Sequence, residues 1–351
     1  MTRFTRWITT IDSHTAGECT RLVTSGLPPI AGDTMAEKLT NAEEDLAWLP
    51  GFLLLEPRGH KDMFGAILTP PCSPEADAGI LFMDNQGYEP MCGHAIIGTA
   101  TTLLETGMSP MDGTETVVTL ETPSGLVRAY AEIGDDKVRS VSFENVPAFV
   151  YRSGVTIEIP QVGTLTIDVV FGGLFFVFVD ASELEIELIP GNAARLARLG
   201  MRILAVANRE IEVRHPELPH IDRIIDLRFY VDEAREESRT ELAGSTSPDS
   251  RNVVVLGDHM IDRSPCGTGT SAEAALRHAE GRLEVGESFV TESIIGTQFI
   301  GTVVDETTVG SEAERFPAII PRITGSACIT GFHQFVLDPS DAFPEGFRLR
   351  V

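Results

Sequence analysis

Two cysteines, each followed by glycine at the start of a helical stretch, constrain this chain more than any other feature. The first stretch runs from Cys92 to Gly107 and is almost entirely small or apolar, so we expect a helix buried on all sides. The second begins at Cys266, 174 residues later, which is about half of the 351-residue chain. A proline-containing turn precedes each cysteine. This repetition predicts two similar halves, each with β-structure wrapped around one central helix.

Short runs rich in β-forming residues, separated by Gly, Pro and Asp, predict the strands. These runs are Phe52–Glu56, Ile80–Met83, Thr116–Leu120, Leu165–Phe171, Phe175–Val179, Asp226–Val231 and Asn252–Leu256. A third helix is predicted at Asn192–Leu199, with a strand at Arg202–Ala207 after it. The polar stretch Glu233–Arg251 is predicted to be a loop. The predicted fold class is therefore α/β (α+β).

The length of the chain favours two domains, because a domain usually contains about 100 to 150 residues. We expect the crossover near Pro147, and we expect the last strand, Ala327–Leu337, to return to the first half. The first domain would then comprise residues 1–148 plus 328–351, and the second residues 149–327. Since each predicted domain carries one Cys-Gly helix start, we expect the active site in the cleft between them.

The composition restricts the partners and the location of the protein. A formal net charge of −25 disfavours nucleic acid, which binds to basic surfaces. No apolar run approaches the roughly 20 residues of a membrane-spanning helix, so no membrane partner is expected. The segment Met1–Trp7 lacks the apolar core of a signal peptide, so we expect a cytoplasmic protein. The chain has five cysteines, an odd number, and no two of them have CxxC spacing. This pattern predicts reduced thiols and no metal site.

The start of a helix suits a reactive thiol. Unpaired N–H groups there stabilise an anion, which lowers the pKa of a thiol and can also hold a carboxylate. Glycine beside the cysteine lets a ligand approach the backbone. Two converging helix starts would bind an amino acid's carboxylate and present one sulfur to each face of its α-carbon. One thiolate would remove the α-proton, the opposite thiol would deliver another, and nearby donors would stabilise the developing enediolate.

Each of these residues also has a purely structural interpretation. A free cysteine is usually a small buried hydrophobe, and only the occurrence of two Cys-Gly helix starts in matching halves favours reactive thiols at Cys92 and Cys266. His94 and Asp262 are candidates to accept thiol protons or to tune the thiols. A capping histidine and a turn-forming aspartate explain these two residues equally well. The other three cysteines lack this context and are interpreted as structural.

Several motifs along most of the chain resemble the proline racemase family, which includes hydroxyproline 2-epimerases and trans-3-hydroxyproline dehydratases. They are Ile11-Asp-Ser-His-Thr-Ala-Gly-Glu18, Glu56-Pro-Arg-Gly-His-Lys-Asp-Met-Phe-Gly65, Met91-Cys-Gly-His94, Glu121-Thr-Pro-Ser-Gly125, Asp262-Arg-Ser-Pro-Cys-Gly-Thr-Gly-Thr270 and Thr330-Gly-Phe-His333. The resemblance implies a fold like that of diaminopimelate epimerase, with two pseudo-symmetric domains. It also implies a cofactor-independent isomerase that acts on a small imino acid, and a homodimer.

The resemblance also assigns roles to individual residues. Cys92 and Cys266 would be the acid/base pair of a two-base mechanism. The two helix starts would bind the substrate carboxylate through Gly93, His94, Gly267, Thr268 and Gly269. Asp262 and His94 would contact the substrate amine or the thiols. Phe64 would pack against the pyrrolidine ring, where an aromatic residue is more typical of proline racemases than of 4-hydroxyproline epimerases, and Leu256 would form another wall of the pocket.

Alternative functions remain at this point. The dehydratases of the family carry Thr where Cys266 stands, so Cys266 disfavours dehydration. Diaminopimelate epimerase has a different sequence around its cysteines. A non-catalytic paralogue could bind a small anion at Cys266–Thr270, although this turn lacks the lysine of a phosphate-binding loop. Pyridoxal phosphate is not expected, because none of the three lysines stands in a recognisable Schiff-base setting. The sequence leaves open proline, 4-hydroxyproline and 3-hydroxyproline as substrates.

Overall fold

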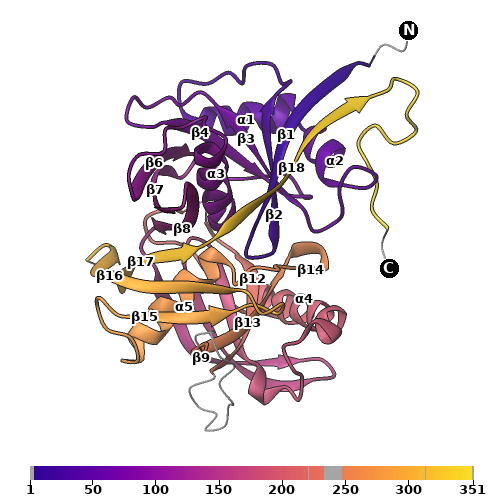
Figure 1. The fold of residues 1–351 in the computed structure, drawn as a ribbon. Coiled ribbons are helices and arrows are strands. Elements are labelled where there is room, and N and C mark those ends of the chain that lie inside the picture. Colours follow the sequence, from indigo (N-terminus) through magenta and orange to yellow (C-terminus); the bar gives the residue numbers. More distant parts are fainter. Residues whose placement is uncertain (1–3, 220, 233–246, 313, 350–351) are drawn as a thin grey trace. The chain divides into compact units, whose positions relative to one another are not determined.

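The structure, a computed structural model, describes residues 4–219, 221–232, 247–312 and 314–349 (Figure 1). Its internal contacts divide the chain into two compact units. Unit 1 comprises Met1–Phe143 and Gly325–Val351, and unit 2 comprises Glu144–Thr324. Among the described residues, no helix is both long enough and apolar enough to cross a membrane.

Unit 1 contains three helices and nine strands among its described residues. In chain order they are β1 (Arg6–Thr15), β2 (Glu18–Ser25), α1 (Met35–Asp45), α2 (Leu49–Leu54), β3 (Phe64–Thr69), β4 (Ala78–Met83), β5 (Tyr88–Glu89), α3 (Gly93–Glu105), β6 (Glu115–Thr122), β7 (Gly125–Gly134), β8 (Lys137–Glu144) and β18 (Ala327–Leu337). Strand β18 pairs along its length with β1, so the last strand belongs to the same unit as the first.

The described part of unit 2 is again mostly strands. Its elements are β9 (Phe149–Ile159), β10 (Gly163–Phe171), β11 (Phe175–Asp180), α4 (Ala193–Glu210), β12 (Ile224–Asp232), β13 (Ser250–Leu256), β14 (Met260–Ile261), α5 (Gly267–Ala279), β15 (Ser288–Glu292), β16 (Gln298–Gly310) and β17 (Arg315–Gly325). Short 3₁₀ turns at Ala181–Glu183, Pro190–Asn192 and Gly257–His259 connect some of them.

The two units repeat one order of strand pairings. In unit 1, β2 is parallel to β3, β3 is antiparallel to β4, and β4 is parallel to β6. In unit 2, β11 is parallel to β12, β12 is antiparallel to β13, and β13 is parallel to β15. Between the last two strands of this order, the chain forms a short strand and then a helix. The helix is α3 in unit 1, between β4 and β6, and α5 in unit 2, between β13 and β15. The predicted internal symmetry is therefore present in the topology.

The helices α3 and α5 are the centres of their units. Every residue of α3 from Gly93 to Leu104 is buried, and the helix packs on β1, β2, β7 and β18. Helix α5 is buried from Gly267 to Arg277 and packs on β9, β10 and β16. The end of α3 is followed by Gly107, whose φ of 73° lies in the left-handed region that favours glycine. The small side chains of both helices allow strands to surround them.

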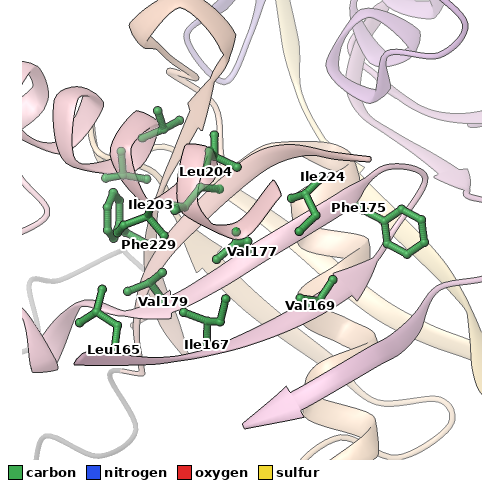
Figure 2. Packing of buried hydrophobic residues seen from close by; sticks show 14 of the residues in the cluster. Leu165, Ile167, Val169, Phe175, Val177, Val179, Ile203, Leu204, Ile224 and Phe229 are labelled. Atoms are coloured by element: carbon green, nitrogen blue, oxygen red, sulfur yellow. The ribbon is translucent and has the colours of Figure 1, made fainter. Parts of the chain in front are cut away.

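Strand β11 explains the layers of unit 2, because its side chains alternate between two cores. Phe175, Val177 and Val179 pack with Ile203 and Leu204 of α4, together with apolar residues of β10 and β12 (Figure 2). The alternate residues, Phe176 and Phe178, pack in the core that contains Cys266 and the alanines of α5. A continuous apolar run thus becomes a strand that is buried on both faces.

Two predicted strands are wrong. The run Phe52–Glu56 overlaps α2, which has Pro50 in its first turn and buries its apolar side chains. The run Arg202–Ala207 lies inside α4, so the predicted third helix continues for eleven residues beyond Leu199, to Glu210. A short apolar run does not distinguish a strand from a buried helical segment, which is the source of both errors.

Helix α1 was not predicted, and the predicted loop Glu233–Arg251 extends too far at its C-terminal end. Residues 233–246 of the predicted loop lie outside the described residues, and Ser250 already belongs to β13. The other six predicted β-rich runs lie within β4, β6, β10, β11, β12 and β13.

Candidate active site

Cys92 is the N-cap residue of α3, with an extended backbone. Its Sγ lies 3.4 Å from Nδ1 and 3.7 Å from Nε2 of His94, which is buried in the first turn of the helix. Cys92 itself is half-buried. Since an imidazole can accept or donate a proton near neutral pH, this contact places a group capable of proton exchange beside the sulfur.

The position of His94 is fixed by residues from two other elements of unit 1. Thr15 at the end of β1 donates a hydrogen bond of 2.8 Å from Oγ1 to the backbone oxygen of His94. Phe64, the first residue of β3, lies edge-on to the imidazole with ring centroids 4.7 Å apart and an interplanar angle of 85°. Unit 1 therefore brings together four of the predicted site residues, namely Phe64, Cys92, Gly93 and His94.

Cys266 is the N-cap residue of α5, and its backbone is unusual. Its φ of 65° lies in the left-handed region, which costs a residue other than glycine about 1 to 3 kcal/mol. The Sγ accepts a hydrogen bond of 3.3 Å from the N–H of Gly269 and lies 3.5 Å from Oγ1 of Thr268. The sulfur thus caps its own helix, and only 6% of the residue is exposed.

Asp262 shapes the turn that leads into this cap. It follows β14, and its Oδ1 accepts a hydrogen bond of 2.7 Å from the N–H of Ser264. The Oγ of Ser264 in turn accepts a hydrogen bond of 3.1 Å from the N–H of Cys266. Leu256, at the end of β13, packs against the core that contains Cys266. The other six predicted site residues, Leu256, Asp262, Cys266, Gly267, Thr268 and Gly269, are therefore neighbours within unit 2.

The first turn of α5 also requires glycine at a position outside the predicted site. A Cβ added to Gly172 would lie 2.3 Å from the backbone oxygen of Thr268 and 2.5 Å from the backbone nitrogen of Ala272. Both atoms belong to the helix backbone and cannot move aside without displacing it. The Gly172–Gly173 turn after β10 therefore allows the strand to lie directly against the helix.

The expectation that a helix start lowers the thiol pKa is wrong for Cys266. Burial is the largest effect, and it raises the pKa of this thiol well above its ordinary value. The carboxylates of Asp262 and Asp226 raise it further. The hydrogen bonds from Thr268 and Gly269 act in the opposite direction but are outweighed. Cys266 is therefore held as a protonated thiol in this state of the protein.

This raised pKa predicts a slow reaction of Cys266 with iodoacetamide near neutral pH. Only the thiolate is alkylated, so we expect the rate at Cys266 to be low at about pH 7 and to keep rising with pH beyond about 8.5, where the rate of an ordinary thiol levels off. Peptide mass spectrometry after timed alkylation measures each cysteine separately, with the exposed Cys328 as a reference in the same sample. A Cys266 that reacts as fast as Cys328 at neutral pH would mean that the helix end outweighs burial.

Two residues that support the site were missed in the sequence. Arg228 on β12 is fully buried and donates a hydrogen bond of 2.8 Å from Nη1 to the backbone oxygen of Pro265, directly before Cys266. Its partner is Glu273, in the middle of α5. A charged residue inside the apolar run Ile224–Asp232 and another inside a buried helix were the available signals. No group of three or more His, Cys, Asp or Glu that could hold a metal ion occurs among the described residues.

Comparison with known proteins assigns the chain to a family. Residues 10–348 match the sequence model of the family described as proline racemase. The chain belongs to the proline racemase family. It is 47% identical over 348 residues to a proline racemase of Clostridioides difficile, covering 99% of this chain and 100% of the relative. The predicted family and fold class are thus confirmed.

Other members of the proline racemase family show the range of named activities. The crystal structure of a hydroxyproline epimerase from Agrobacterium vitis, with bound trans-4-hydroxy-L-proline, is similar with a TM-score of 0.85 and 36% identity. This similarity covers 99% of the present chain and 97% of the epimerase. A trans-3-hydroxy-L-proline dehydratase of Bacillus cereus is 41% identical over 341 residues, which are 97% of this chain and 98% of the dehydratase.

Proposed function

We propose that this member of the proline racemase family is a cofactor-independent isomerase that inverts the α-carbon of proline or a hydroxyproline. The observation that carries the proposal is the repeated constellation of a Cys N-cap, a glycine after it and a buried central helix, once in each unit. The similarity to a proline racemase and to a hydroxyproline epimerase supports this substrate class.

In the proposed mechanism, the first-turn N–H groups of α3 and α5 hold the carboxylate of the substrate. One sulfur removes the α-proton, and the other delivers a proton to the opposite face, so the configuration inverts. The N–H groups stabilise the negative charge that develops on the carboxylate as the α-carbon becomes planar. In the reverse reaction the two sulfurs exchange roles.

The two thiols are not equivalent, and their difference supports a two-base scheme. Such a scheme needs one thiol and one thiolate at the start of each turnover. Burial keeps Cys266 protonated, which suits it to deliver the proton in one direction. Cys92 is less buried and contacts the imidazole of His94, which can carry its proton away. We propose that Asp262 and His94 also contact the substrate amine, and that Phe64 and Leu256 form apolar walls around the ring.

Dehydration of trans-3-hydroxyproline is the second candidate, because a relative with 41% identity has this activity in its name. Elimination of water needs one base at the α-carbon, whereas inversion needs a group on each face. Cys266 favours inversion, since the resemblance implies Thr at this position in the dehydratases. A dehydrated ring product and an inverted amino acid are distinguishable in one experiment.

The test is incubation of proline and hydroxyproline stereoisomers in deuterated water, followed by proton NMR and polarimetry. We expect at least one substrate to lose its α-proton signal while its optical rotation changes toward that of the epimer or the racemate. Loss of water from 3-hydroxyproline without inversion would support the dehydratase instead. If no stereoisomer exchanged its α-proton, the chain would be a binding protein and the proposal would be wrong.

Alkylation protection tests the assignment of the site. We expect iodoacetamide to inactivate the enzyme and pyrrole-2-carboxylate to slow both inactivation and labelling, because its planar ring mimics the flattened α-carbon. Inactivation without protection would indicate that the essential thiol lies elsewhere.

The proposal also includes a cytoplasmic homodimer, as the family resemblance implies. Sedimentation equilibrium of the purified protein tests the dimer.

A further inference from the structure

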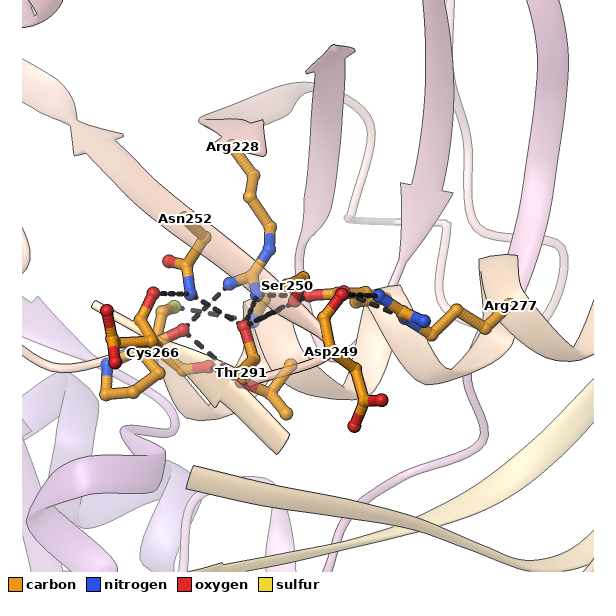
Figure 3. A network of polar contacts seen from close by, with 12 residues as sticks. Arg228, Asp249, Ser250, Asn252, Cys266, Arg277 and Thr291 are labelled. Carbon is orange, nitrogen blue, oxygen red and sulfur yellow. Dashed lines mark hydrogen bonds and ion pairs between the residues drawn. The ribbon is translucent and has the colours of Figure 1, made fainter. Parts of the chain in front are cut away.

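The buried guanidinium of Arg228 connects the residue before Cys266 to the middle of helix α5 (Figure 3). Its Nη1 donates a hydrogen bond of 2.8 Å to the backbone oxygen of Pro265. Its Nη2 forms an ion pair with Glu273 and donates a hydrogen bond of 2.9 Å to Oγ1 of Thr291. One rigid, planar group therefore holds the turn before the helix and the helix itself at fixed positions.

The surroundings of Arg228 leave the guanidinium little freedom to move. Thr291 also accepts hydrogen bonds of 2.9 Å from Nδ2 of Asn252 and from Oγ of Ser250. The other carboxylate oxygen of Glu273 accepts a hydrogen bond of 2.9 Å from Nε of Arg277. The network is buried among strands β12, β13 and β15 and helix α5, so water cannot replace these partners at low cost.

The sulfur of Cys266 lies directly beside this network. A Cβ added to Gly269 would lie 3.0 Å from Nη1 of Arg228 and 3.2 Å from Sγ of Cys266. A side chain at position 269 would therefore have to displace the guanidinium or the sulfur by a few tenths of an ångström. The left-handed backbone of Cys266 is thus bordered on one side by the clamped Pro265 oxygen and on the other by the Gly269 N–H.

We propose that Arg228 is a positioning residue for Cys266. By holding the oxygen of Pro265, it keeps the following residue in its left-handed conformation, and this conformation places Sγ on the N–H of Gly269. Arg228 does not touch the sulfur and acts only through the backbone. The inference rests on the proposed function only in its consequence for turnover, because the placement of Cys266 can be measured without any substrate.

Unit 1 offers an internal control. There the first turn of α3 is held by the neutral hydroxyl of Thr15, and Cys92 has an ordinary extended backbone. A change at Arg228 should therefore affect the thiol in unit 2 and leave the thiol in unit 1 unchanged.

The test is site-resolved alkylation of the whole protein with iodoacetamide, comparing Arg228→Lys with the wild type. Lysine keeps the charge for Glu273 but loses the fork that reaches Pro265, Glu273 and Thr291 together. We expect Cys266 to react about tenfold faster, because the released thiol becomes accessible to water and reagent and this gain outweighs the loss of the Gly269 hydrogen bond, and Cys92 to change by less than about twofold. Arg277→Lys is the matched control, since Arg277 pairs with the same Glu273 but has its other contacts with Asp232 and the backbone oxygen of Asp249. This variant should leave both rates near those of the wild type.

A second variant decides the matter if Arg228→Lys does not fold. Thr291→Val keeps both charges and nearly the same volume, but removes the hydroxyl to which Nη2 donates. We expect the same selective change at Cys266, smaller than that of Arg228→Lys. The proposal would be overturned if Cys266 reacted at the wild-type rate in a folded Arg228→Lys protein. If that variant does not fold, a wild-type rate in Thr291→Val would overturn it.

Steady-state kinetics separate this inference from the proposed function. If both hold, the variant that releases Cys266 should lower kcat and leave KM nearly unchanged, because ground-state binding of the carboxylate is preserved. Faster alkylation of Cys266 without any effect on kcat would mean that the positioning is real but that the thiol has no role in turnover. Lower kcat with unchanged alkylation would mean that Arg228 acts by another route, against the inference.

Discussion

The variants Cys92→Ser and Cys266→Ser are each expected to lower kcat/KM for racemisation by about 10² to 10⁴-fold. A serine hydroxyl has nearly the size of the thiol but is a far weaker acid, so it neither removes nor delivers the α-proton effectively. Because each face of the α-carbon needs its own group, one substitution should suffice for the loss. Polarimetry with the substrate identified by the stereoisomer panel measures the effect in both directions.

Cys328→Ser is the matched control for these variants. Cys328 is an exposed thiol on β18, outside the proposed site, so its loss should leave kcat/KM unchanged. Circular dichroism should show that all three variants are folded. Near-normal racemisation by either Cys92→Ser or Cys266→Ser would refute the two-base scheme. Retained α-proton exchange without inversion in one variant would instead identify the sulfur that still acts as a base.

Glu273→Gln is expected to lower the free energy of unfolding by about 3 to 5 kcal/mol, because it leaves buried Arg228 and Arg277 without their shared countercharge. Burial alone would raise the pKa of Glu273, but Arg228 and Arg277 outweigh burial and lower it to about 2. Urea unfolding at neutral pH measures the loss. Glu280→Gln is the control, since its ion pair with Arg282 is solvent-exposed and should contribute only about 0 to 1 kcal/mol.

The same carboxylate gives the stability a defined pH dependence. A pKa that is lowered in the folded state contributes stability above the pKa of the unfolded chain, which is about 4.3 for glutamate. That contribution should be lost as the pH falls from about 4.3 toward about 2, where folded Glu273 takes up its proton. The difference in stability between wild type and Glu273→Gln should therefore shrink in this range. A difference that stayed constant down to about pH 2 would contradict the ion-pair explanation.

The sequence predicted the secondary structure correctly where the local pattern and the long-range packing favour the same structure. The run Phe175–Val179 predicts a strand by its composition, and burial on both faces makes it one. The Cys-Gly starts at Cys92 and Cys266 predict two helix ends, and both residues are N-caps. The family followed from the resemblance of the motifs at these starts, and of others along the chain, to those of proline racemases.

The two wrongly predicted strands are short apolar segments whose residues do not by themselves favour a strand over a helix. Phe52 lies in a helix because Pro50 suits a first helical turn and the surrounding core accepts the apolar side chains. Helix α4 continues through Gly200, and the lack of a side chain there lets the helix lie close against β13, because an added Cβ would lie 2.7 Å from Val255. In both cases the neighbours in space, and not the residues in the run, determined the secondary structure.

By itself, the sequence determined the family, the two helix starts and the residues gathered around each of them. Only the tertiary structure decided the protonation of Cys266, because the burial that raises its pKa most, and the carboxylate of Asp226, come from other parts of the chain. The role of Arg228 was decided in the same way, 37 residues before the backbone oxygen that it holds. Helix patterns extend over a few residues, whereas solvation and electrostatic interactions depend on everything that the fold brings within a few ångströms.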